Sequence, residues 1–225
     1  PRDRWDYTAT QQIMLADLPL GEGGADRRVV MQAPKNGFFY VLDAADGELI
    51  SATPFTAQNW TTGEFDENGR PVLIEEAVDL ALYAVVPGPT GAHNWHPMAF
   101  NPDTGLVYIP VNEIPFFYDK TRNVEDSKSF WNIGYDAAAG WPVEYPAGTL
   151  DAVADMDGGS LLAWDPVKAE PRWAVPFALP LNGGVLSTDA GLVFQGNKFG
   201  DLVAYDAETG ERLWSEQLVG NAAAA

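Results

Sequence analysis

Gly200-Asp201-Leu202-Val203-Ala204-Tyr205-Asp206 decides the fold class, because this stretch is one copy of an internal repeat. The segment 159–165, Gly-Ser-Leu-Leu-Ala-Trp-Asp, has the same pattern 41 residues earlier, and the same offset relates Trp173 to Trp214. The segment 37–43, Gly-Phe-Phe-Tyr-Val-Leu-Asp, has the same Gly-to-Asp spacing and begins 122 residues before Gly159, close to three periods. A period near 40 residues with several short strands per unit is typical of β-propeller blades.

The turn that follows each copy supports this interpretation. The pattern Asp-x-x-x-Gly occurs at 43–47 and at 206–210, whereas Ala169 replaces the glycine in the middle copy. The Asp side chain can cap the turn, and glycine supplies a left-handed backbone position. The Trp of each complete copy is predicted to pack between neighbouring blades.

The chain is therefore predicted to be all-β, a partial β-propeller with about 40 residues per blade and three to four blades' worth of strands. The competing interpretation is a β-sandwich whose Asp-Gly hairpins are coincidental. The 41-residue offset preserves seven or more matching positions, which favours the propeller.

Composition limits the function classes. The 225 residues include 32 Asp and Glu against 13 Lys and Arg, giving a formal net charge of −19, which argues against nucleic-acid binding. Cysteine is absent, so the chain can hold no disulfide, thiolate metal site or Cys-linked haem. No apolar run is long enough to span a membrane as a helix. The first residue is Pro1, and we expect the chain to be truncated at both ends.

Four motifs in order carry a family resemblance: Trp-Asp-Tyr-Thr-Ala-Thr-Gln at 5–11, Ala-Pro-Lys-Asn-Gly-Phe-Phe-Tyr-Val-Leu-Asp at 33–43, Gly-Ala-His-Asn-Trp-His-Pro-Met at 91–98, and Asn-Gly-Gly-Val-Leu at 182–186. With them, the chain resembles the quinoprotein alcohol dehydrogenases, which use pyrroloquinoline quinone (PQQ), and most of all the type II quinohaemoprotein ethanol dehydrogenases. The resemblance implies that residues 1–225 are the C-terminal part of an eight-bladed quinoprotein propeller domain.

The resemblance also implies roles for individual residues. Asp6 matches the family's catalytic base, which also lies against a calcium ion. Lys35 matches the cation that bonds the reactive quinone oxygens, and Asn94 and Trp95 match residues that contact the quinone. Asn182 belongs to a segment that passes near the cofactor. From spacing alone, Asp6 and Lys35 would be interpreted as ordinary turn residues.

The chain departs from the family pattern at Leu181, where relatives commonly have Trp. This change affects either the packing around the quinone or the substrate pocket. His93 and His96 form a His-x-x-His pair, but a third metal ligand is not apparent. We therefore interpret both histidines as structural polar residues.

The function implied by the resemblance is oxidation of primary alcohols to aldehydes with PQQ and Ca²⁺, with electrons passing to cytochrome c or a haem domain. A haem c would lie in a part of the parent protein outside this chain, and the parent is expected in the periplasm, with no nucleic-acid partner. Two alternatives stay open. One is a non-catalytic propeller scaffold, and the other is a quinoprotein that acts on sugars or polyols.

Overall fold

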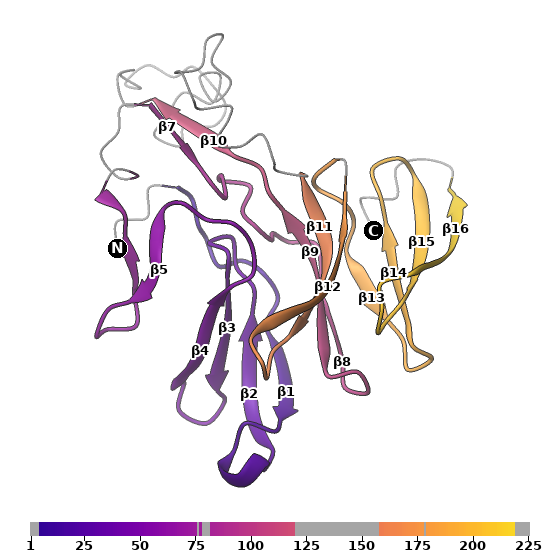
Figure 1. The fold of residues 1–225 in the computed structure, drawn as a ribbon, viewed down its shortest axis with the longest axis horizontal. Helices are drawn as coiled ribbons and strands as arrows, with labels where there is room; N and C mark the ends of the chain where they lie inside the picture. Colours follow the sequence, from indigo (N-terminus) through magenta and orange to yellow (C-terminus); the bar gives the residue numbers. More distant parts are fainter. Residues whose placement is uncertain (1–4, 76, 78–81, 120–157, 178, 219–225) are drawn as a thin grey trace.

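The structure is a computed structural model that describes residues 5–75, 77, 82–119, 158–177 and 179–218. Apart from residues 75 and 77 and the short 3₁₀ turn η1 (Glu22–Gly24), the regular structure in these ranges is β. No helix among the described residues has the length and apolar character needed to cross a membrane. Figure 1 shows the strands gathered into separate sheets that lie side by side.

Three antiparallel four-stranded sheets make up most of the fold (Figure 1). The first sheet contains β1 (Met14–Leu18), β2 (Arg27–Gln32), β3 (Phe38–Asp43) and β4 (Leu49–Pro54), in that order. The second sheet has the order β12 (Glu170–Pro176), β11 (Gly159–Asp165), β9 (Leu106–Asn112) and β8 (Ala99–Asn101). The third sheet contains β13 (Val185–Ser187), β14 (Leu192–Gly196), β15 (Asp201–Asp206) and β16 (Arg212–Gln217).

Two smaller antiparallel pairs accompany the sheets. The strands β5 (Thr61–Phe65) and β6 (Pro71–Leu73) form a hairpin after the first sheet. The strands β7 (Leu82–Val85) and β10 (Phe116–Asp119) pair with each other, and β8 and β9 lie between them in the sequence. These pairs occupy the chain that lies between the repeat units.

The predicted repeat corresponds to one hairpin in each sheet. Strand β11 with β12 and strand β15 with β16 contain the two copies related by 41 residues, and β3 with β4 contains the third. Each hairpin has a register shift at the same place, after Val41, Ala163 and Ala204. The partners of these residues across the hairpin are Ser51, Trp173 and Trp214, respectively, so these three positions are equivalent.

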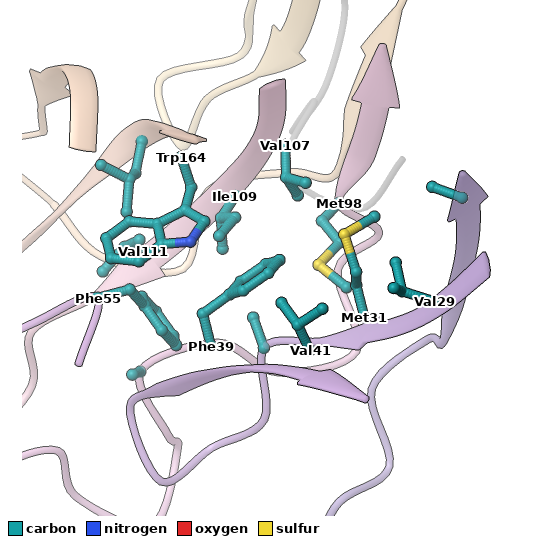
Figure 2. Close-up of a cluster of buried hydrophobic side chains, with 14 of the residues drawn as sticks. Val29, Met31, Phe39, Val41, Phe55, Met98, Val107, Ile109, Val111 and Trp164 are labelled. Atoms are coloured by element: carbon teal, nitrogen blue, oxygen red, sulfur yellow. The ribbon is translucent and has the colours of Figure 1, made fainter. Parts of the chain in front are cut away.

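The first and second sheets pack face to face through a buried apolar cluster. Figure 2 shows Phe39 of the first sheet on the side of Ile109 and Trp164 of the second, and Met31 in the same cluster alongside Met98. The Phe39 and Trp164 rings lie 5.8 Å apart. Strand β9 is buried along its whole length, because the third sheet covers its other face.

The second and third sheets are joined by a contact centred on Trp173. Its indole nitrogen donates to the Ala207 carbonyl oxygen at 3.1 Å, and the Tyr108 hydroxyl donates to the same oxygen at 3.0 Å. A Cβ atom on Gly210, whose φ is +73°, would lie 2.7 Å from the Trp173 ring. The turn glycine of the third sheet is therefore required both by its backbone conformation and by the close approach of Trp173.

A third cluster covers the outer face of the first sheet. Trp5, Phe38 and Trp60 are buried there, and the Trp5 and Trp60 rings lie 5.4 Å apart. Because Trp5 is anchored in this cluster, the chain that follows it is held at one end of the first sheet. The predicted all-β architecture and the partial β-propeller are confirmed, since three repeat-related sheets pack successively through their faces.

Candidate active site

The predicted site residues lie in segments that precede strands at the same end of the three sheets. Asp6 precedes β1, Lys35 lies between β2 and β3, Asn94 and Trp95 precede β8, and Asn182 precedes β13. Because β1, β8 and β13 hold equivalent positions in their sheets, the segments before them converge. The antiparallel connection from β2 to β3 returns to this same end of the first sheet.

Asp6 and Lys35 are in direct contact. The Lys35 ammonium donates to the Asp6 carboxylate Oδ2 at 3.0 Å and to the Asp6 main-chain oxygen at 3.1 Å. The Lys35 side chain is 9% exposed and that of Asp6 is 48% exposed. A buried cation thus fixes the carboxylate, while the carboxylate itself stays accessible from the open side.

Asp6 has a left-handed backbone conformation, with a φ of 62°. Non-glycine residues seldom adopt this region, although Asp and Asn do so more readily than others. Trp5 immediately before it is buried in the third cluster, whereas Asp6 is exposed. The unusual backbone conformation therefore accompanies a Trp5 side chain that packs in the core and an adjacent Asp6 side chain that lies in the site. Strained backbone positions of this kind are often found at functional sites.

The loop before β8 is packed tightly against Lys35. The Ala92 amide donates to the Lys35 carbonyl oxygen at 2.9 Å. A Cβ atom on Gly91, whose φ is +78°, would lie 2.3 Å from Lys35 Cγ. Only glycine allows the loop that carries Asn94 and Trp95 to approach Lys35 this closely.

Asn94 and Trp95 differ in exposure. Asn94 is buried, and its side-chain amide donates to the Thr90 carbonyl oxygen at 2.9 Å, which closes the loop on itself. Trp95 is 72% exposed and stacks on His96, with ring centroids 5.2 Å apart. An indole with one free face is suited to contact a planar ligand.

Asn182 is linked to the same region through the main chain. The Lys35 carbonyl bonds Ala92, the Ala92 carbonyl accepts from the Asn112 amide at 2.7 Å, and Asn112 Oδ1 accepts from the Leu181 amide at 2.8 Å. The Asn182 amide group donates to Leu179 and accepts from the Lys198 amide. Both ends of this side chain thus bond the protein's own backbone, and its contact with a cofactor stays a prediction.

Sequence reasoning missed Asn112 as part of this arrangement. It is buried at the end of β9 and holds Leu181, whose φ of 61° is left-handed, through the amide. A polar residue at the end of an otherwise apolar strand was the available signal. Its partner 69 positions away was not apparent from the sequence.

Among the described residues, no group of three or more His, Asp or Glu side chains could hold a metal ion. Calcium takes six to eight oxygen ligands. Asp6 could supply one of them through Oδ1, since Lys35 occupies Oδ2. The residues present fit a single ligand to a hard cation.

The same residues fit PQQ better. A quinone with carboxylates offers anionic oxygens and a flat ring system. Lys35 provides a buried ammonium whose third hydrogen is not used by the two bonds to Asp6, and Trp95 provides an exposed aromatic face. Burial, together with the positive charge of Lys198, lowers the pKa of His96, so this ring adds no cation beside Trp95 at neutral pH.

Comparison with known proteins shows that this chain is similar to part of several quinohemoprotein alcohol dehydrogenases. It is 45% identical to the quinohemoprotein alcohol dehydrogenase ADH-IIG of Pseudomonas putida over 100% of the chain and 32% of that protein. It is 40% identical to the 1-butanol dehydrogenase (cytochrome c) of Thauera butanivorans over 97% of the chain and 31% of that protein. The chain spans about a third of the length of the curated relatives it matches.

Solved structures agree. The ADH-IIG structure superimposes with a TM-score of 0.80 at 41% identity, covering 96% of this chain and 32% of that one. A europium-containing methanol dehydrogenase superimposes with a TM-score of 0.79 at 29% identity, covering 98% and 37%. Residues 157–225 match a family model described as outer membrane protein assembly factor BamB.

Proposed function

We propose that this chain supplies the catalytic base and part of the cofactor site of a PQQ-dependent alcohol dehydrogenase. It matches about a third of the length of the quinohaemoprotein alcohol dehydrogenases that it resembles. The observation that carries the proposal is the Asp6–Lys35 pair. A half-exposed carboxylate is held at 3.0 Å by a buried ammonium, and the loop that packs against Lys35 carries an exposed indole.

Asp6 is proposed to accept the proton of the alcohol hydroxyl at Oδ1. Its other oxygen, Oδ2, is held by the Lys35 ammonium, which fixes the orientation of the carboxylate. A general base must lie within hydrogen-bonding reach of the proton that it takes, and a fixed carboxylate meets this requirement for a substrate bound on the exposed side.

Lys35 has a second proposed role. Its buried ammonium is a preorganised positive charge, and such a charge stabilises negative charge that develops on an oxygen in the transition state. PQQ, when bound, would supply the acceptor for the hydride of the alcohol carbon. Trp95 would bind the ring system through its exposed face, and Asn94 would hold the loop that carries Trp95 in place.

Several finer points belong to this proposal. Calcium next to Asp6 is supported by the resemblance, and a similar solved structure, a europium-containing methanol dehydrogenase, contains a hard cation. Relatives named as 1-butanol dehydrogenase (cytochrome c) and lupanine 17-hydroxylase [cytochrome c] support cytochrome c as the electron acceptor. A haem c elsewhere in the parent and a periplasmic location are inferred from the family alone.

The scaffold alternative has one observation in its favour, the match to the BamB model over residues 157–225. That match contains the hairpins of the second and third sheets, but it excludes Asp6, Lys35, Asn94 and Trp95. It therefore reflects the repeat rather than the site. The names of the relatives favour alcohols over sugars and polyols as substrates.

The test uses the full-length protein that contains this chain, with PQQ, either Ca²⁺ or a lanthanide ion, an alcohol and an artificial electron acceptor. Asp6→Asn is the informative variant, because Asn tolerates the left-handed backbone at this position. We expect PQQ-dependent alcohol oxidation that the variant loses while it still binds PQQ. Full activity in the variant would remove Asp6 from the mechanism, and absence of PQQ binding would favour the scaffold.

A further inference from the structure

Lys198 holds the position in the third sheet that Lys35 holds in the first. The copy of the repeat that begins at Gly200 follows the copy that begins at Gly37 by 163 residues, and the same offset relates Lys198 to Lys35. Lys35 lies in the connection from β2 to β3, and Lys198 lies in the connection from β14 to β15. The corresponding residue of the middle copy is Asp157, so the repeat pattern does not require a lysine at this position.

The two connections are held in the same way. Gln32 at the end of β2 and Gln195 in β14 are related by the same offset as the lysines. The Gln32 side-chain amide donates to the Gln11 carbonyl oxygen at 2.9 Å. The Gln195 side-chain amide donates to the Gly183 carbonyl oxygen at 2.8 Å. Each acceptor lies in the segment before the first strand of its sheet, so the main chain places both lysines at the site end of the sheets.

The connection that contains Lys198 is joined to the loop that carries Trp95. The Lys198 amide donates to Asn182 Oδ1 at 3.2 Å. The segment that contains Asn182 holds the loop, because the Val185 amide donates to the Pro97 carbonyl oxygen at 2.8 Å. The two equivalent lysine segments therefore contact this loop, one directly near its start and the other through Asn182 near its end.

The Lys198 ammonium is near the imidazole ring that stacks on Trp95. Burial is the first cause of the lowered pKa of His96, and the positive charge of Lys198 is the second, so the two groups are close enough to interact. Lys198 is partly buried and forms no ion pair in the part of the chain that the structure describes, whereas Lys35 is paired with Asp6. In a chain with a formal net charge of −19, an unpaired cation at the site end is suited to bind an anionic group.

We propose that Lys198 is a further binding residue of the site and that it binds a carboxylate group of the ligand whose ring contacts Trp95. This inference rests on the proposed function, which places a planar ligand at Trp95. An ammonium binds a carboxylate through charge-assisted hydrogen bonds, which are about twice as strong as neutral ones. The carboxylate belongs either to PQQ or to an alcohol substrate that carries one, and the experiment separates these two sources.

The first measurement is the affinity of the full-length, metal-loaded apoprotein for PQQ, determined by titration. If PQQ supplies the carboxylate, Lys198→Met weakens binding about 10-fold, and Lys198→Arg, which keeps the charge, stays within about 3-fold of the unmodified protein. Lys168→Met is the matched control, because it removes one positive charge in the turn between β11 and β12, at the end of the sheets remote from the site. We expect the control to change the affinity less than about 3-fold.

The second measurement compares kcat/KM for a primary alcohol with that for a hydroxycarboxylate of the same chain length. If the substrate supplies the carboxylate, Lys198→Met leaves the PQQ affinity unchanged and lowers the relative kcat/KM for the hydroxycarboxylate about 10-fold, whereas Lys168→Met does not. An unchanged PQQ affinity together with an unchanged ratio, or with no oxidation of the hydroxycarboxylate by the unmodified protein, overturns the inference. Failure of the unmodified protein to bind PQQ overturns the proposed function, and the inference with it.

Discussion

Replacing Gly210 with Ala tests the contact that joins the second and third sheets. Two costs are expected. A left-handed backbone costs a non-glycine residue about 1 kcal/mol or somewhat more. In addition, the new Cβ would lie 2.7 Å from the Trp173 ring, which must move, and overpacking of this kind costs about 1–3 kcal/mol. The sum predicts that Gly210→Ala lowers the free energy of unfolding by about 2–4 kcal/mol.

Gly47 provides a matched control within the same chain. It holds the equivalent turn position in the first sheet, with a φ of +79°, and nothing lies within 4 Å of a Cβ built there. Gly47→Ala should therefore show the backbone cost alone, about 1 kcal/mol. The difference between the two variants measures the packing against Trp173.

A double-mutant cycle completes the test. In a Trp173→Ala background the obstruction is gone, so Gly210→Ala should cost no more than Gly47→Ala. The assay is denaturant-induced unfolding of the full-length protein, monitored by circular dichroism. Variants are compared when the unfolding free energy depends on denaturant concentration with the same slope. Equal losses for Gly47→Ala and Gly210→Ala in the unmodified background would refute the reasoning, as would a Gly210→Ala cost that persists without Trp173.

Three further predictions concern the site and the surface. Lys35→Met should lower the turnover number about 100-fold or more, because a preorganised charge near the reacting oxygens is lost. An unchanged circular dichroism spectrum of the PQQ-free variant would show that it still folds. An unchanged turnover number would contradict the role given to Lys35. Asn112→Ala leaves the Leu181 amide without its partner, so it should destabilise the protein by about 1–3 kcal/mol and speed hydrogen exchange at 181–184, as mass spectrometry can show; unchanged exchange there would contradict it. The pKa of Asp43 is lowered, first by its hydrogen bond from Arg27 and then by the Ala45 amide, so its contribution to stability is present above the unfolded-state value and is lost as the pH falls below about 4. Arg27→Ala should flatten this acid loss in a series of unfolding curves at different pH, and an equally steep loss would show that the pair does not matter.

The repeat could be predicted from the sequence because each hairpin is local. Strand, turn and returning strand lie within 18 residues, from Gly159 to Pro176, and in the other two copies the Asp and Gly that shape the turn are only four positions apart. The way in which the sheets pack could not be predicted to the same level. Contacts such as Trp173 with Ala207 join residues 34 positions apart, and the choice of partner depends on sheet geometry.

For the site, the resemblance supplied roles, and the structure supplied the contact between Asp6 and Lys35. Spacing could not have shown this pair, because it depends on a left-handed backbone at Asp6 and on the anchoring of Trp5 in the third cluster. His93 was interpreted as a structural polar residue. Its burial between two carbonyl groups became apparent only when the loop before β8 was placed against the segment before Lys35.

The position equivalent to Trp173 in the first sheet is Ser51, and the turn of the sheet that follows it has Ala169, at a φ of 56°, in place of glycine. Where the large ring is absent from one unit, the glycine is absent from the next. In this chain the two positions are therefore matched across a boundary between repeats, so that a unit fits its successor as well as its own strands. Units matched in this way cannot be exchanged freely, because a Trp placed before a turn that lacks glycine would meet a Cβ atom.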